Sequence, residues 1–421
     1  ADDVDWFDAH GPSYSQTGPQ EQGAPVYAMP IFPFPPKSVD FGNFVIGDAM
    51  TVASRIWACA ALLAASIAPA SADIRAFNAA VQSGDYRAAV IAANETWPAI
   101  DRAGPDAASV AREFGWIAML ANQPATALVY SKFLVEQGAS LAQPDSSPVV
   151  SRVLHDWATL ASEPSPQSRT RLFASLQQRG AAPGHDLISA RAAHALYAQA
   201  WAAGDWAQAG DSAILAIRFL DELRSGLAPA RFELRRGLAV SAFMRGASVE
   251  AYTAVYDVAA ELADLIATTP DGGIRQRYAA EYFAAVAWGD VMYGALGARQ
   301  KTTPDRRTTV RQVADLLYPA PGDPALPRCR ISLARNFDNP GFPFESRFKN
   351  LGGEVIYALN VEAGGLFSNP RLLVSAPHAG FASEVSDVLT SWRWRIDGNV
   401  SPPNCRMPQV HILTFAFALG K

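Results

Sequence analysis

Hydrophobic residues along the chain follow two different spacings. Between residues 73 and 318, Ala-rich segments carry apolar residues three and four positions apart and are separated by short runs containing Gly, Pro or Asp. After the Pro-rich stretch 319–326 the pattern alternates, as in residues 353–365, GEVIYALNVEAGG, where a half-buried strand enters a Gly-Gly turn. The two spacings predict an all-α body at 73–318, a linker at 319–326 and a small α+β domain at 327–421.

Four elements are expected in this final domain. The strand that begins after Glu354 is followed by a second strand around residues 371–375 and by an amphipathic helix over residues 379–394. A last strand covers residues 410–419. The order strand, strand, helix, strand is typical of an antiparallel sheet with one helix packed on it.

A short turn recurs within the helical body. Residues 77–89, FNAAVQSGDYRAA, and residues 197–209, YAQAWAAGDWAQA, both run from a helix into Gly-Asp-aromatic, with an Ala three positions after the aromatic residue. Weaker copies lie at Asn122, 38 residues after Gly84, and at Gly246, 42 residues after Gly204. This pattern resembles the tetratricopeptide repeat, which implies a solenoid of helical hairpins; an irregular helix bundle is the alternative.

A solenoid of this kind has a concave groove that could hold a peptide. Aromatic residues at helical spacing usually pack in the core. Four aromatic residues could line the groove or pack in the core instead: Tyr197, Trp201, Trp206 and Trp288.

Residues 50–72 have the three parts of a secretory signal peptide. Arg55 supplies the positive charge, residues 56–68 are apolar, and Ala-Ser-Ala at 70–72 fits a cleavage site between Ala72 and Asp73. Export to the periplasm is therefore expected. Residues 1–49 are rich in Gly, Pro, Ser and Gln and are expected to be disordered; they are either an over-extended reading frame or a flexible arm before the signal.

Export gives the cysteines a specific meaning. Removal of the signal peptide leaves Cys329 and Cys405, and an even pair in an oxidising compartment is expected to form a disulfide. The alternative is a shared metal site, but the two residues lack the close spacing that zinc sites use. No metal site is therefore expected.

Charge and motifs argue against several functional classes. The net charge is -5 and the chain has no basic arm, which disfavours nucleic-acid binding. Neither HExxH, GxSxG nor GxxxxGK occurs, so zinc protease, serine hydrolase and nucleotide-binding signatures are absent from the sequence. We therefore expect a protein that is not an enzyme, with no cofactor and no catalytic residue to name.

Motifs in the final domain occur in a recognisable order. Residues 339–343 read NPGFP, residues 353–355 read GEV, residues 363–365 read AGG and residues 392–394 read WRW. This order and spacing resemble the periplasmic C-terminal domain of TonB energy transducers, over the whole final domain and none of the helical body. Asn stands where the family has Gln, and Phe where it has Tyr.

The resemblance implies a module that captures an extended peptide by adding it to an exposed sheet edge. Its partner would be the periplasmic segment of an outer-membrane receptor or of another envelope protein. The residues carried over as peptide contacts come from the NPGFP segment and from the last strand, which is the expected edge: Asn339, Pro340, Phe342, Pro343, Val410, Ile412 and Thr414.

The sequence thus predicts a soluble periplasmic adaptor with a tetratricopeptide-like helical body and a TonB-like docking domain. Two alternatives stay open. One is an atypical energy transducer that keeps its signal as a membrane tether, although the chain lacks the long Pro-rich spacer of such proteins. The other is an envelope enzyme with its active site in the helical body. The oligomeric state is not predicted.

Overall fold

The computed structural model describes ten stretches of the chain: residues 71–137, 148–182, 186–223, 228–246, 248–296, 310–334, 339–343, 352–389, 391–397 and 401–417. The upstream segment 1–49 and the signal sequence up to residue 70 lie outside these described residues. Ala72 and Asp73, which flank the expected cleavage site, lie in the first turn of the first described helix. Signal cleavage and export stay predictions.

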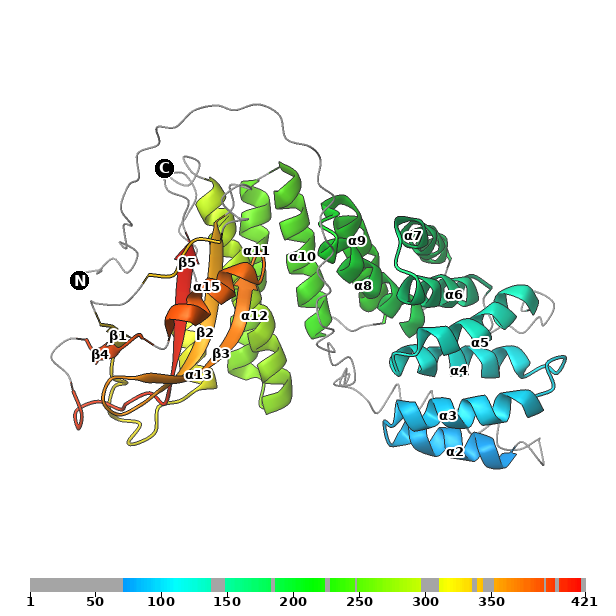
Figure 1. Cartoon of the computed structure of the whole chain (residues 1–421), viewed down its shortest axis with the longest axis horizontal. Helices are drawn as coiled ribbons and strands as arrows, with labels where there is room; N and C mark the ends of the chain where they lie inside the picture. The colour runs from blue at the N-terminus through cyan, green and yellow to red at the C-terminus, as the bar shows by residue number, and fades with distance from the viewer. Residues whose placement is uncertain are drawn as a thin grey trace.

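The expected all-α body is confirmed, and its helices follow one another along the molecule (Figure 1). Consecutive helices pack on one another along the whole series, and the part of the chain before residue 318 contains no strand among its described residues. The helices are α2 (Ser71–Gln82), α3 (Tyr86–Thr96), α4 (Ala107–Leu120), α5 (Pro124–Gln137), α6 (Pro148–Ser162), α7 (Pro166–Ala181), α8 (Leu187–Ala202), α9 (Trp206–Glu222), α10 (Pro229–Gly246), α11 (Val249–Thr268), α12 (Gly272–Leu296) and α13 (Val310–Leu317), with a 3-10 turn η2 (Trp97–Ala99) after α3.

The recurring turn has one backbone geometry in three of its four copies. Gly84, Asn122 and Gly204 all have positive φ, at 76°, 58° and 68°. In each copy the N–H of this residue donates to the carbonyl three positions back, and the next N–H donates to the carbonyl five positions back. These are the two bonds of a Schellman motif, which ends a helix at a left-handed residue. The copy at Gly246 lacks the positive φ, because α10 continues through this residue.

The Asp that follows the Gly in the two strongest copies starts the next helix. Asp85 accepts a hydrogen bond from the Ala88 N–H over 3.0 Å, and Asp205 accepts one from the Gln208 N–H over 3.1 Å. Both are N-caps, which satisfy donors that the first turn of a helix leaves free. Gly-Asp therefore ends one helix and begins the next within two residues.

The final domain contains a three-stranded antiparallel sheet with the order β3-β2-β5. A hairpin joins β2 (Gly353–Val361) to β3 (Phe367–Ala376), and α15 (Gly380–Leu389) packs on one face before the chain returns as β5 (Val410–Phe417). A separate two-stranded ribbon pairs β1 (Ile331–Leu333) with β4 (Trp394–Ile396). Figure 1 shows this domain against α12, at the opposite end of the molecule from α2.

The helix predicted over residues 379–394 is shorter in the structure. It ends at Leu389, and Trp394 belongs to β4. The Trp394 N–H donates to the Gly365 carbonyl over 2.8 Å, and its ring Nε1–H donates to the Leu366 carbonyl over 2.9 Å. Contacts with the β2–β3 turn, which are distant in sequence, therefore override the helical pattern at this position.

The prediction that β2 is half-buried is wrong. Its first seven residues are all buried, and its two faces lie in different cores. Val355 and Tyr357 pack with α15, whereas Ile356 packs with α10, α11, α12 and α13. The helical body therefore covers the face of the sheet that the sequence assigned to solvent.

The hydrophobic core forms three clusters. One fills the array from α2 to α9, a second joins α10–α13 to the sheet, and a third lies between the sheet and α15. Within the ranges described above, none of the helices has both the length and the apolar composition needed to cross a membrane.

Candidate functional site

Among the described residues, the last strand, β5, pairs with β2 alone, so its other side is an edge of the sheet as described. In an antiparallel pair, every second residue exchanges backbone hydrogen bonds with the partner strand and the others point away. The Val361 N–H donates to the Gln409 carbonyl over 2.9 Å, which fixes this alternation. The backbone groups of Val410, Ile412 and Thr414 therefore point away from β2, at the edge that the sequence selected for peptide contacts.

Arg328 occupies the first position of this outer edge. Its guanidinium donates to the Val410 carbonyl over 2.9 Å and also pairs with Asp315 of α13. Further along, no backbone hydrogen bond from another described segment reaches Ile412 or Thr414. The edge that can accept a new strand therefore begins after Val410.

The side chains of the edge face two different environments. Ile412 is half-buried against the core of the helical body, on the face of the sheet that α12 and α13 cover. Leu413 and Phe417 are buried on the opposite face, with α15. A strand added at this edge would therefore be held mainly through its backbone, because the neighbouring side chains already pack inside the protein.

The NPGFP segment reaches the far end of β5. The Phe342 ring lies 5.7 Å from the Phe381 ring and 5.9 Å from the Phe417 ring, centroid to centroid. Pro343 is buried, Pro340 is half-buried and Asn339 is exposed. Phe342 and Pro343 thus hold the segment on the domain. Since eight residues of strand span about 25 Å, these two lie at the opposite end of the edge from Val410.

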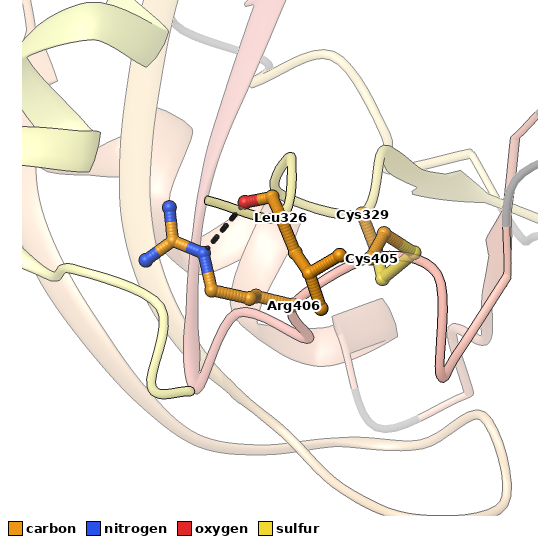
Figure 2. The surroundings of a disulfide bond; sticks show 4 residues. All are labelled: Leu326, Cys329, Cys405 and Arg406. Carbon is orange, nitrogen blue, oxygen red and sulfur yellow. Dashed lines mark hydrogen bonds between the residues drawn. A yellow bond between two sulfur atoms is a disulfide. The ribbon is translucent and has the colours of Figure 1, made fainter. Parts of the chain in front are cut away.

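A disulfide fixes the segment that leads into β5. Cys329 and Cys405 are bonded, with a Cα–Cα distance of 4.9 Å, as the sequence predicted. Arg406 adds to this anchor: its Nε–H donates to the Leu326 carbonyl over 2.9 Å (Figure 2). Its backbone also accepts a hydrogen bond from the Cys329 N–H over 2.8 Å. The start of the edge strand is thus covalently tied to the segment before β1.

The aromatic residues considered for a groove in the helical body pack against one another. The Trp201 ring lies 5.1 Å from Trp206, 5.4 Å from Trp288 and 5.7 Å from Tyr197, centroid to centroid. Tyr197 and Trp288 are buried, and Trp201 and Trp206 are half-buried. The cluster joins α8, α9 and α12, which is the packing role expected of these residues.

Charged side chains that the sequence did not single out form a network beside this cluster. His194 Nε2 of α8 lies 3.0 Å from Glu233 Oε2 of α10, and Arg236 of α10 donates to Glu281 of α12 over 3.1 Å. Burial alone would lower the pKa of His194, but the Glu233 carboxylate raises it, and the net shift is upward. Dozens of residues separate the partners in sequence, so no local pattern marks them.

The helical body also contains one serine–histidine contact. Ser131 Oγ lies 3.3 Å from His155 Nδ1, but Ser131 is fully buried and a substrate could not reach it. Among the described residues, no group of three or more His, Cys, Asp or Glu side chains is arranged to hold a metal ion. The chemistry available at the sheet edge is therefore backbone hydrogen bonding, which suits peptide binding.

Comparison with known proteins adds no family to this description. No protein-family model matches the chain, and no curated protein matches it.

Proposed function

We propose that this protein is a non-enzymatic periplasmic adaptor that docks an extended peptide from another envelope protein as an added strand on β5. The observation that carries the proposal is the outer edge of β5, where the backbone groups of Ile412 and Thr414 point outward with no described partner segment. Edge strands of this kind readily pair with another chain.

Two further features support the proposal. The order of β2, β3, α15 and β5, with the NPGFP segment and Trp392 packed on the same domain, suits a TonB-like docking module. The helical pairs joined by Schellman turns at Gly84, Asn122 and Gly204 suit a tetratricopeptide-like body. In this proposal the body supports the sheet and the sheet holds the peptide.

The proposal can be tested with the full chain and a short synthetic peptide of alternating threonine and valine, labelled with fluorescein. Thr414→Pro removes an outward N–H without removing a hydrogen bond of the sheet, because this N–H does not point toward β2. We expect the peptide to bind the variant at least about tenfold more weakly than the wild type, as measured by fluorescence anisotropy.

Two matched controls isolate the backbone contribution. Thr414→Val keeps the N–H and changes only the side chain, so its affinity should stay within about twofold of the wild type. A peptide with N-methyl groups on alternate residues should not bind. Equal affinity of the wild type for the methylated and unmethylated peptides would refute strand addition, provided that thermal unfolding shows both variants to be folded.

A further inference from the structure

The outer edge of β5 has a definite start. Arg328 already donates to the Val410 carbonyl over 2.9 Å, so this acceptor is occupied before any peptide arrives. The remaining residues with outward backbone groups begin at Ile412 and end at Ala416. A docked peptide therefore pairs with residues 412–416.

The two faces of this stretch of β5 differ in chemistry. Ile412 packs on the helical body, and Thr414, which lies on the same face, is polar. On the face that carries α15, Leu413 is buried but Phe415 is only half-buried. Phe415 is therefore a large apolar side chain that an added strand can still cover.

Phe415 belongs to a group of packed aromatic rings. Its ring lies 5.0 Å from the Phe417 ring and 5.9 Å from the Trp392 ring, centroid to centroid. Phe342 of the NPGFP segment lies 5.9 Å from the same Phe417 ring and is also half-buried. Phe342 and Phe415 thus bring two partly exposed aromatic rings to the last part of the edge.

The two sides of Phe415 within the sheet are not equivalent. On β2, Val355 stands opposite Phe415 and is fully buried, whereas no described strand stands opposite it on the outer side. Side chains that stand opposite each other on neighbouring strands lie on the same face of the sheet, with Cβ atoms about 4.5–5.5 Å apart. The residue of an added strand that stands opposite Phe415 therefore meets its ring.

We propose that the docked peptide carries an aromatic residue opposite Phe415, and that this residue packs against the rings of Phe342, Phe415 and Phe417. The inference rests on the docking proposed above and adds the chemical class of the ligand, an extended peptide with phenylalanine, tyrosine or tryptophan at one defined position. Backbone pairing is nearly independent of sequence, so this contact supplies selectivity. Aromatic rings pack favourably with one another in offset or edge-to-face contacts.

A change of one residue in the peptide tests this inference with the full chain. The parent is the labelled peptide of alternating threonine and valine, and its derivative has phenylalanine in place of a central valine. The derivative should bind the wild type about threefold to tenfold more tightly than the parent, as measured by fluorescence anisotropy.

This gain should depend on Phe415. In Phe415→Ala the derivative should bind at most about twofold more tightly than the parent, because the ring that it contacts is gone. Leu372→Ala is the matched control: it removes an apolar side chain, 47% exposed, from β3 at the opposite edge of the sheet, and it should keep the full gain. An equal gain in the wild type and in Phe415→Ala would overturn the inference.

Cross-linking of the wild type keeps the test decisive if Phe415→Ala does not fold. A peptide with benzoylphenylalanine in place of the phenylalanine should attach on irradiation to residues 340–343 or 413–417, as identified by mass spectrometry. Attachment elsewhere would overturn the inference. If the parent peptide binds and phenylalanine adds nothing, only this inference fails. If neither peptide binds, the docking proposal fails with it.

Discussion

Gly289 shows how a single missing side chain lets two helices meet. A Cβ atom at this position in α12 would overlap the buried ring of Tyr256 in α11. The same arrangement occurs at Gly237 of α10, where a Cβ would overlap the Tyr197 side chain. In the sequence these glycines indicate only a lower helix propensity within helical segments. Their packing role follows from partners in other helices, which the sequence does not reveal.

Gly289→Ala should therefore destabilise the protein by about 1–3 kcal/mol, because the new methyl group forces the Tyr256 ring or the helix to move. Gly294→Ala is a matched control in the same helix, since a Cβ there meets no atom within 4 Å. It should leave stability unchanged or increase it by roughly 0.5–1 kcal/mol. Urea unfolding of both variants measures the difference, and equal effects would contradict this account.

Among the helices and strands, the turns that end helices could be predicted from the sequence, whereas the burial of the faces of a strand could not. The turns at Gly84 and Gly204 were evident in the sequence because a left-handed glycine and a capping Asp act within a few residues. The burial of β2 was misjudged because residues 355–361 alternate, and alternation is typical of a strand with one face in solvent. What covers a sheet face depends on contacts distant in sequence, and alternation alone does not encode them.

The pairing of α8 with α10 should depend on pH through His194. Its pKa is raised by Glu233, so the stabilisation is complete below the ordinary histidine value, about 6.5, and is lost as pH rises through the higher value of the folded state. His194→Gln should therefore cost about 1–2 kcal/mol below pH 6 and much less at pH 8.5. Thermal unfolding across this range measures the difference.

Glu233→Gln is the complementary variant for this ion pair. It removes the carboxylate that raises the pKa of His194, so the decline in stability between pH 6 and pH 8.5 should also become smaller. The double variant with His194→Gln and Glu233→Gln should lose no more of the pH dependence than either single variant does. Each single change already removes the ion pair between these two side chains, so the effects should not add. Independent, additive effects would argue against the pair.

For the molecule as a whole, the disulfide between Cys329 and Cys405 closes a large loop of the chain. It joins residues 76 positions apart, and the chain-entropy model gives about 4 kcal/mol for a loop of that length. Replacement of Cys329 and Cys405 by Ser should lower the free energy of unfolding by about 2–4 kcal/mol in urea. Reductant should destabilise the wild type by a similar amount and leave the double variant unchanged; a wild type insensitive to reductant would contradict this.

The sequence predicted the two structural regions but not how they fit together. The helical spacing corresponds to helices up to α13, and the alternating spacing that follows corresponds to the strands from β1 onward. The interface between them uses single residues such as Ile356 and Val374, each of which also fits an isolated domain. Only the folded chain brings them to α12.

The shared core between the sheet and α10–α13 has a consequence for anyone who cuts or transplants this domain. A fragment that begins at residue 327 would carry Ile356, Val374 and Ile412 on a bare apolar surface, and the remaining helices would carry the complementary one. The shortest fragment that keeps the apolar face of the sheet covered begins before α10. The linker at 319–326 therefore marks where the chain changes character, but it is not a place at which the protein can be divided.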